Sequence, residues 1–165
     1  RDHRTCNETV PVPKSVISLY TNTMLVSFRV KILRPTAKLP AYAHPGDAGM
    51  DLFAPEAVTI SAHERVIIPM GISFEFPEGY VALIMDKGGP SAKYGLTTLG
   101  GVVDAGYRGE LMVTMLNTTD TDYTFAPGDK IAQLLIQPVV YAEISEVAAL
   151  SDHERGEGRF GSTGK

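Results

Sequence analysis

The sequence predicts an all-β protein, and three observations support this fold class. Short apolar runs are separated by Gly, Pro, Asp and Asn at intervals of about 8 to 12 residues, which is the spacing of an all-β sandwich or barrel. Several runs alternate apolar with polar residues, as strands with one buried face do. Only the stretch LSDHERGEG at 150–158 has the polar composition of a helix, and it is too short to change the class.

The predicted strands are spread over the chain from about Met24 onward. In chain order they are LVSFRVKIL, AVTI, RVIIPMGISFEF, YVALIMD, GELMVTMLN, DYTFA and KIAQLLIQPVV. Residues 1–23 mix charges, prolines and threonines without a clear period, so we expect them to form a flexible N-terminal extension. One β domain over 24–150 and a flexible C-terminal segment over 151–165 complete the predicted organisation.

The first of these runs illustrates the pattern. Val26, Phe28, Val30 and Ile32 alternate with polar residues, so we expect them to share one face of a strand and that face to lie in the core. Turn signals separate the runs: PGD at 45–47 and 127–129, PEG at 77–79, and the glycine pair at 100–101.

The composition is that of an ordinary globular protein and excludes several classes of function. The chain has 165 residues, about one domain, of which 44% are hydrophobic and 21% charged. A net charge of −4 gives no global attraction to a polyanion, so nucleic acid is not an expected partner. Cys6 is the only cysteine, which excludes an internal disulfide. The apolar runs fall far short of the ~20 residues that span a bilayer, so we expect no membrane span and a cytoplasmic location, or a nuclear or organellar one in a eukaryote.

The stretch GGVVDAGYRGEL at 100–111 predicts a hairpin with an acid and an aromatic residue, Asp104 and Tyr107, at its mouth. Gly100 and Gly101 would let an aromatic base approach the main-chain N–H and C=O groups, because no Cβ stands in the way. A plain hairpin with Asp in its turn is the alternative.

Three further stretches place polar residues among small or apolar ones. In PGDAGMDLFAPE, Asp51 is either a turn acid or a carboxylate for hydrated Mg²⁺, which prefers one or two acids together with waters and phosphates. In MDKGGPSAKYGL, the glycines, Lys87 and Ser91 form either a solvated turn or a loop that aims N–H groups and a cation at an anion. In PGDKIAQLLI, Gln133 is an amide in an apolar strand, so it either satisfies neighbouring backbone or points into a site.

The C-terminal stretch RGEGRFGSTGK at 155–165 combines glycines with cations, hydroxyls and one aromatic residue. It is not a P-loop, because Ser162 stands where a lysine should follow Gly161. Arg155 can pair with a phosphate, N–H groups around Gly161 can form an anion-binding nest, and Phe160 can stack on a base. We interpret the stretch as a terminus that a ligand orders, with a disordered end as the alternative.

Taken in this order, the five stretches resemble the five motifs of the trimeric dUTPase family. The matching segments are AGMDLFAPE, GGPSAKYGL, GGVVDAGYRGEL, GDKIAQLLI and RGEGRFGSTG, and the resemblance covers nearly everything from about Met24 to the C-terminus. It implies a jelly-roll-like β-sandwich or barrel assembled as a homotrimer with shared active sites. It also implies Mg²⁺-assisted hydrolysis of dUTP to dUMP and pyrophosphate, which limits uracil in DNA and supplies dUMP for dTMP synthesis.

The resemblance implies a role for each motif residue. As catalytic residues, Asp104 would orient the water that attacks the α-phosphorus, Asp51 would hold waters of the Mg²⁺ shell, and Gln133 would bind near the α-phosphate. The implied substrate-binding residues are Lys87, Gly88, Gly89 and Ser91 in the second motif, Gly101, Val102, Val103 and Tyr107 in the third, and Arg155, Phe160, Gly161, Ser162 and Thr163 in the fifth. In the family, Tyr107 would exclude a 2′-hydroxyl, the backbone at 101–103 would read uracil, and the fifth motif would close over a neighbour's site.

The chain departs from the family pattern in two places. Lys87 and Gly88 stand where the family has Arg-Ser, and Arg159 stands where glycine is usual. Lysine keeps the charge but loses the bidentate fork, and glycine cannot donate a hydroxyl. Two alternatives to a dUTPase are therefore kept: a non-catalytic nucleotide-binding or regulatory trimer, and a relative of the dCTP deaminases. The second is disfavoured because the strand LMVTMLN lacks the glutamate that deamination would require.

Overall fold

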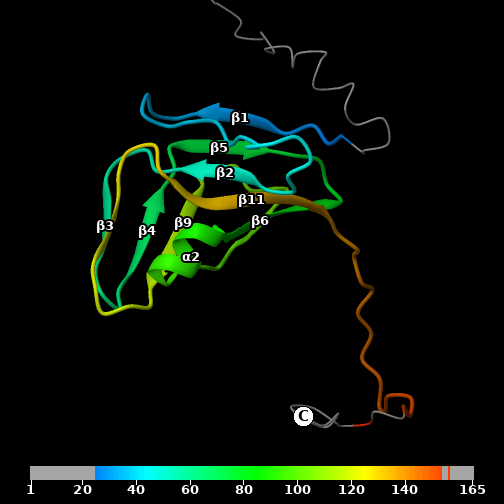
Figure 1. Cartoon of the computed structure of the whole chain (residues 1–165). Helices are drawn as coiled ribbons and strands as arrows, with labels where there is room; N and C mark the ends of the chain where they lie inside the picture. The colour runs from blue at the N-terminus through cyan, green and yellow to red at the C-terminus, as the bar shows by residue number, and fades with distance from the viewer. Residues whose placement is uncertain (1–24, 154–155, 157–165) are drawn as a thin grey trace, which may run out of the picture.

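The computed structural model describes residues 25–153 and 156, and this part of the chain is an antiparallel β structure with one short helix (Figure 1). Its strands are β1 (Arg29–Ile32), β2 (Met50–Phe53), β3 (Val58–Ile60), β4 (Arg65–Pro69), β5 (Ile72–Glu75), β6 (Tyr80–Asp86), β7 (Leu96–Leu99), β8 (Val102–Asp104), β9 (Met112–Asn117), β10 (Tyr123–Phe125) and β11 (Lys130–Pro138). Within the described residues they pair as β1-β5, β10-β3, β2-β11-β6-β8 and β4-β9-β7. The predicted all-β class is confirmed.

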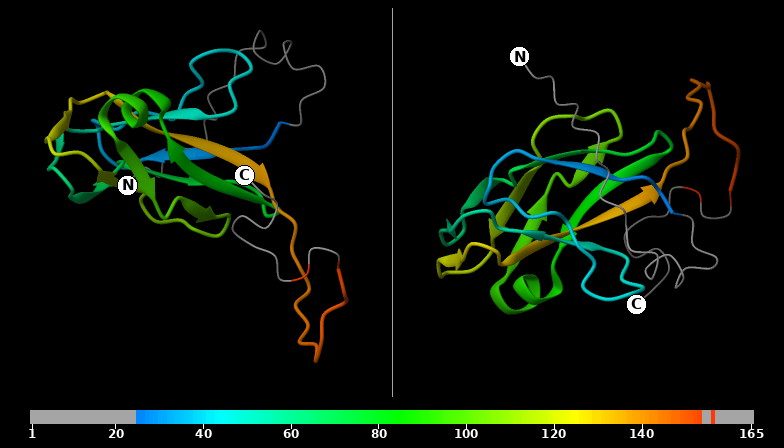
Figure 2. Two further views of the ribbon diagram at one scale, coloured as in Figure 1. Left: turned by 60° about the horizontal axis from the view of Figure 1, so that its bottom comes forward. Right: turned by 90° about the horizontal axis from the view of Figure 1, so that it is seen from above.

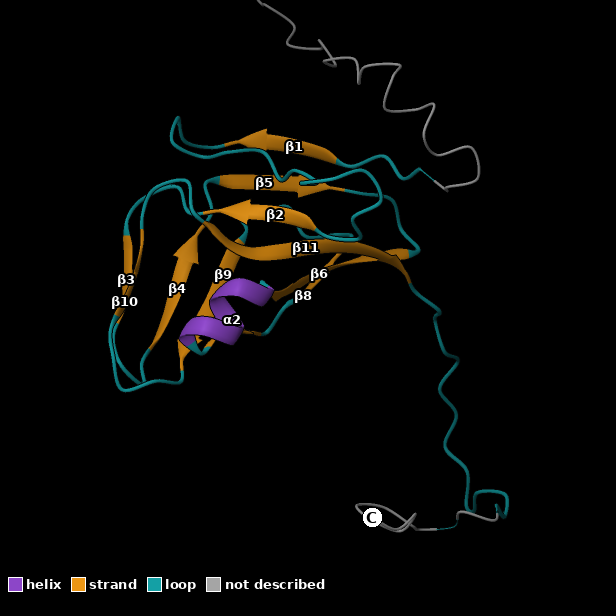
Figure 3. Cartoon of the chain, viewed as in Figure 1, coloured by secondary structure: helices purple, strands orange, loops and turns teal. Residues whose placement is uncertain are grey.

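Several elements differ from the sequence prediction, and strand β7 (LTTL) was not predicted at all. The predicted run at 65–76 is two strands, β4 and β5, because Gly71 between them has a φ of 69°, which residues with a Cβ rarely adopt. Strand β2 was not predicted, since its four residues lie between turn signals and obtain their pairing from β11. The glycine-rich stretch predicted as a loop forms helix α2 (Gly88–Tyr94), drawn in purple in Figure 3.

Helix α2 is closed at its C-terminal end by Gly95, which is left-handed and donates its backbone N–H to the carbonyl oxygens of Pro90 and Ser91. The polar stretch expected to be helix-like is not helical over its described residues 150–153. No helix in the described part of the chain is long and apolar enough to cross a membrane.

The alternation predicted for the first strand is confirmed in part. Phe28 and Val30 pack against the core, where Phe28 lies 5.1 Å from Phe74 between ring centroids. Ile32 is 42% exposed, so its predicted burial was wrong. Within the described residues β1 pairs with β5 alone, so it is an edge strand of a two-stranded sheet.

The longest ladder of the fold joins β6 and β11, with Ala132 to Pro138 opposite Asp86 to Tyr80. On its inner face Ala82, Ile84 and Leu134 are almost fully buried. Full burial of such a Leu or Ile side chain contributes about 1.5–3 kcal/mol to folding. The inner face of this sheet is therefore fixed by the core, which leaves its outer face available for polar side chains.

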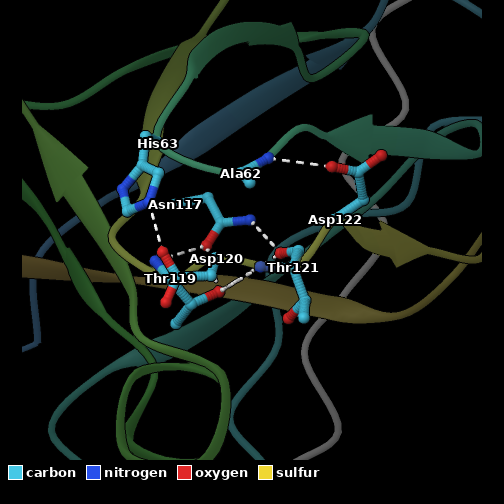
Figure 4. A network of polar contacts seen from close by, with 7 residues as sticks. All are labelled: Ala62, His63, Asn117, Thr119, Asp120, Thr121 and Asp122. Carbon is cyan, nitrogen blue, oxygen red and sulfur yellow. Dashed lines mark hydrogen bonds and ion pairs between the residues drawn. The ribbon is translucent and has the colours of Figure 1, made fainter.

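A buried amide ties together the loops where β3 and β4 connect and where β9 and β10 connect (Figure 4). Asn117 is 0% exposed, and its Nδ2 donates to the backbone oxygens of Ile60 at 3.0 Å and Thr121 at 2.8 Å. Its Oδ1 accepts from the N and Oγ1 of Thr119. Two donors and two acceptor positions exhaust the hydrogen-bonding capacity of the amide, so this network fixes the loops without a net charge.

Beyond Pro138 the chain leaves the body as an extended arm, residues 139–153 (Figures 1 and 2). Its start is tied to the body by hydrogen bonds from Val139 N to Gly79 O and from Gly79 N to Tyr141 Oη. Further along, Val140, Ile144 and Leu150 are 97%, 94% and 87% exposed. Apolar side chains so exposed in a row indicate that another surface covers the arm.

Candidate functional site

Strand register divides the predicted site residues between two places on the outer face of the β2-β11-β6-β8 sheet. Asp51 on β2 lies opposite Gln133 on β11, which lies opposite Met85 on β6. Asp104 lies on the far edge strand, β8, opposite Val81. Three strand spacings across the sheet and four residues along β6 separate Asp51 from Asp104, so the two carboxylates are roughly 20 Å apart in one chain.

Asp51 is a buried carboxylate held by two cations. Its side chain is 3% exposed; the Lys87 ammonium bonds to Oδ1, and the Lys130 Nζ lies 2.6 Å from Oδ2. Burial by itself raises the pKa of Asp51, but the hydrogen bonds and charges of Lys130 and Lys87 outweigh it and hold the pKa below its usual 3.8. Asp51 is therefore ionised at neutral pH, and the three groups together carry a net positive charge that suits an anionic ligand.

Gln133 both satisfies backbone and faces a cavity, so the two predicted alternatives apply together. Its Nε2 donates to the backbone oxygen of Asp86 at 2.8 Å. Its Oε1 lies over Gly49, where a Cβ would come within 2.6 Å of it. Gly49 has no positive φ, so the sequence needs glycine here for space rather than for backbone conformation.

The cavity beside Gln133 has a volume of about 470 Å³. Its polar lining includes Gln133, Asp86, Thr97 and Thr98. The Asp86 carboxylate accepts hydrogen bonds from the Thr97 hydroxyl and from both the N–H and the hydroxyl of Thr98. Burial alone raises the pKa of Asp86, but these bonds, led by the Thr98 N–H, lower it overall. Asp86 thereby anchors the end of β6 to β7.

The second motif surrounds the start of helix α2. Lys87 is its N-cap residue, and Gly88, Gly89 and Ser91 lie in its first turns. A Cβ built on Gly88 or Gly89 would meet nothing within 4 Å, so the backbone here borders open space. The anion-facing loop predicted for this motif is thus a short helix, and Lys87 points to Asp51 rather than to solvent alone.

The predicted hairpin of the third motif was wrong. The hairpin would have Asp104 in its turn, but the strands on either side of residues 105–111 belong to different sheets: β8 pairs with β6, and β9 pairs with β4 and β7. The cause is close packing at Gly101, whose Cβ would collide with the carbonyl oxygen of Ile84 and whose own oxygen accepts from Ile84 N at 2.7 Å. The turn therefore passes the chain from one sheet to the other.

The third motif nevertheless converges on one place. Gly100, Val102, Val103, Asp104 and Tyr107 line a second cavity of about 210 Å³, next to Ile84, which also lines the first. An acid and an aromatic residue, Asp104 and Tyr107, thus line a single hollow together with Gly100 and two valines of the same motif.

The Tyr107 ring is fixed in this hollow by its own loop. Its hydroxyl donates to the Glu110 oxygen at 2.9 Å, and a Cβ on Gly109 would collide with the ring. The Arg108 guanidinium donates to the oxygens of Ala105 and Tyr107, which braces the same loop. These contacts hold the Tyr107 ring in a defined orientation.

The predicted residues of the fifth motif are not among those described, and two residues near the site, Lys130 and Asp86, were not predicted from the sequence. Arg155, Arg159, Phe160, Gly161, Ser162 and Thr163 lie outside the described residues. Sequence reasoning missed Lys130 and the side chain of Asp86. Lys130 directly follows the turn at 127–129, and Asp86 directly precedes Lys87, so both lie inside the quoted motif stretches. Their position within a motif was the only feature of the sequence that could have marked them as site residues.

Comparison with known proteins gives one consistent result. The dUTPase family model matches residues 35–164. The deoxyuridine 5'-triphosphate nucleotidohydrolase of Leifsonia xyli is 51% identical over 130 residues, which are 77% of this chain and 86% of that protein. The protein of the same name from Clostridium tetani is 45% identical over 84% of this chain and 97% of its own length.

Solved structures agree with these relatives. A mutant dUTPase of Staphylococcus bacteriophage 80alpha, solved with dUpNHpp, matches with a TM-score of 0.78 and 32% identity over 88% of this chain and 100% of its own. A mutant dUTPase from phage phi11 of S. aureus, whose description names a structural Mg(II) ion, matches with a TM-score of 0.70 and 28% identity over 76% of this chain and 99% of its own.

Proposed function

The chain belongs to the dUTPase family, and we propose that it is an enzyme that hydrolyses dUTP to dUMP and pyrophosphate. The observation that carries the proposal is the hollow of the third motif, where Asp104 and Tyr107 meet Gly100, Val102 and Val103. A base that is recognised by backbone hydrogen bonds leaves buried polar groups unpaired when the wrong base enters, which discriminates more strongly than bulk alone.

In the proposed reaction, Asp104 orients a water for attack on the α-phosphorus, and pyrophosphate leaves. Tyr107 packs against the deoxyribose, and its fixed ring leaves no room for a 2′-hydroxyl. Gln133, Lys87, Gly88, Gly89 and Ser91 bind the phosphates. Such phosphoryl transfer proceeds by positioning and charge neutralisation and needs no covalent intermediate.

The residues present fit Mg²⁺ that is held mainly by nucleotide phosphates. Asp51 is a single carboxylate, and the described residues contain no group of three His, Cys, Asp or Glu that could cage a metal. One acid with waters and phosphates is the coordination that Mg²⁺ prefers. Bound in this way through water to Asp51, Mg²⁺ supplies neutralisation of phosphate charge.

We propose a jelly-roll homotrimer whose active sites are shared between subunits. The roughly 20 Å between Asp51 and Asp104 in one chain is too far for both to act on one α-phosphate, which supports a site built from two copies. The exposed apolar arm at 139–153 supports the same assembly, since a neighbouring copy would cover it.

The remaining parts of the proposal concern the termini and the location. Residues 24–150 form the β domain and 151–165 the lid, in which Arg155, Ser162 and Thr163 grip phosphates and Phe160 and Gly161 cover the uracil; residues 1–23 are an extension. A cytoplasmic enzyme agrees with the single cysteine. Strand β9 contains no acid, so deamination is not proposed.

The test is pyrophosphate release from dUTP, dTTP, dCTP and UTP by the wild type and by Asp104→Asn. We expect release from dUTP alone, and a loss of about 10²–10³-fold or more in kcat for Asp104→Asn. Nucleotide binding with equal, negligible turnover in both proteins would instead assign a binding or regulatory trimer. Ammonia release from dCTP would assign a deaminase.

A further inference from the structure

Lys130 contacts the site although no predicted role includes it. Its ammonium lies 2.6 Å from Asp51 Oδ2, while the Lys87 ammonium takes Oδ1. A carboxylate that is almost completely buried thus has one cation on each oxygen. An incoming triphosphate competes with the carboxylate for these two cations, because each is a phosphate-binding group in its own right.

A β-bulge brings Lys130 to this position. Lys130 lies opposite Phe53 and Ala132 lies opposite Leu52, so Ile131 is an extra residue in β11. In a regular ladder Lys130 would share a face with Ala132, which is 0% exposed in the core. The extra residue reverses this, because it turns Ile131 into the core and Lys130 onto the outer face with Asp51.

The two lysines lie in different local structures: Lys87 at the start of a helix and Lys130 at the start of a strand. Lys87 caps a short helix beside Gly88 and Gly89, which border open space on the side where phosphates are proposed to bind. Lys130 follows a turn that is fastened to the end of β2 by hydrogen bonds from Gly128 N to Ala54 O and from Ala54 N to Asp129 O. Lys87 therefore stands beside the open space at Gly88 and Gly89, whereas Lys130 follows a turn that the fold fastens next to Asp51.

We propose that Lys130 is a positioning residue for the reaction, which holds Asp51 in place when Lys87 moves from Asp51 to the nucleotide phosphates. The inference rests on the proposed function and deepens it. A buried carboxylate that loses its last cation is strongly disfavoured, so the transfer of Lys87 requires a second cation on Asp51. With Lys130 on Oδ2, the departure of Lys87 leaves Oδ1 free for the water around the divalent cation.

The first experiment separates the roles of the two lysines by steady-state kinetics on dUTP. For Lys130→Met we expect kcat to fall about tenfold or more while KM changes less than about twofold, because a transition-state interaction is lost; for Lys87→Met we expect mainly a higher KM. Lys130→Arg keeps a cation and should restore most of kcat. Lys31→Met, on the exposed face of β1, removes a lysine elsewhere and should match the wild type.

A second readout does not depend on turnover. Calorimetric binding of the non-hydrolysable analogue dUpNHpp is measured with and without Mg²⁺ for each variant. In the wild type and in Lys130→Arg we expect Mg²⁺ to tighten binding, and in Lys130→Met we expect most of that gain to be lost. A purely structural role for Lys130 would lower the melting temperature but leave the Mg²⁺-dependent ratio unchanged.

The outcomes are distinct. The proposal is overturned if Lys130→Met keeps both the wild-type kcat and the wild-type tightening of dUpNHpp binding by Mg²⁺. It is also overturned if Lys130→Arg restores neither kcat nor this tightening. If Lys130→Met does not fold, Lys130→Gln is put through the same two measurements. If the wild type binds the analogue but does not cleave dUTP, the proposed function fails, and the Mg²⁺ ratio alone decides the role of Lys130.

Discussion

Asn117 and Asp51 are the two buried polar side chains in the described part of the chain, and they are stabilised in opposite ways. Asn117 is neutral and is satisfied by the backbone of two loops and by Thr119, all nearby and all fixed (Figure 4). Asp51 is charged and is satisfied by two long lysine side chains from different elements. Backbone partners cannot leave, whereas lysine side chains can.

This difference separates a structural polar group from a functional one. A neutral amide with all its hydrogen bonds made locks one loop arrangement. A buried ion pair contributes little net stability relative to an apolar alternative, so its retention needs another reason, such as exchange of partners with a ligand. Mutations at the two sites should therefore affect different measurements.

The largest effect is expected on activity at Asp51. Asp51→Asn should lower kcat by about 10³-fold, since it removes the carboxylate that pairs with both lysines and is proposed to hold the waters of Mg²⁺. The measurement is pyrophosphate release from dUTP. Circular dichroism at 25 °C should show a folded protein; a variant that is folded and fully active would contradict the role given to Asp51.

The complementary effect is expected on stability at Asn117. Asn117→Ala leaves buried carbonyl and N–H groups unpaired and should lower the free energy of unfolding by about 3 kcal/mol, without changing kcat per folded molecule. Urea denaturation measures the first quantity and an activity assay the second. Asn117→Asp is the matched variant: it cannot donate to the Ile60 and Thr121 oxygens and should be destabilised at least as much.

A smaller effect on activity is expected where the active-site amide needs space. Gly49→Ala places a Cβ against Gln133 Oε1 and should displace the amide, with a loss of about tenfold in kcat/KM, or roughly 1.4 kcal/mol. Gly106→Ala is the control, since a Cβ there meets nothing within 4 Å and the φ is not positive. Equal losses in both variants would rule out the positioning role of Gly49.

The dependence of stability on pH sharpens the same comparison. Because the folded-state pKa of Asp51 lies below 3.8, its ion pairs contribute stability above that pH and lose it as pH falls through the lowered value. The difference in unfolding free energy between wild type and Asp51→Asn should thus be constant from pH 7 to about 5 and should shrink below 3.8. The corresponding difference for Asn117→Ala should not vary with pH.

The smallest effect is expected beside Asn117, at the exposed pair of His63 and Asp120 (Figure 4). Their side chains are 63% and 97% exposed, so solvent screens the interaction. Asp120→Ala should change the free energy of unfolding by less than about 0.5 kcal/mol. A loss above about 1 kcal/mol in urea denaturation would mean that the network of Asn117 extends to this pair.

An element could be predicted from the sequence where its own residues determine its structure, and could not where a contact with a distant part of the chain does. YVALIMD was predicted as a strand and is β6 from end to end, because its apolar run and the turn signals on either side are local features of the sequence. The hairpin at 100–111 failed because the choice of pairing partner is made by Gly101 against Ile84, a contact between distant parts of the chain. Helix α2 was missed because its two glycines are poor helix formers, and its C-terminal cap, Gly95, adds a third glycine to the stretch read as a loop.

The site shows the same division. Asp51, Gln133, Asp104 and Tyr107 were identified because they stand inside recognisable motifs, and the structure puts the first two side by side through strand register. The lysine on the other Asp51 oxygen was not identified, because its direction depends on one extra residue in β11. Strand alternation read from the sequence assigns Lys130 to the wrong face.

The extended arm has a consequence for the lifetime of the chain at low concentration. An accessible main chain with apolar side chains is what proteases and chaperones bind. In the proposed trimer a neighbouring copy covers the arm, so an unassembled chain would be clipped between residues 139 and 153, whereas an assembled one would resist cleavage. Dilution followed by brief chymotrypsin digestion, which can cut after Tyr141 and Leu150, should therefore distinguish unassembled from assembled chains.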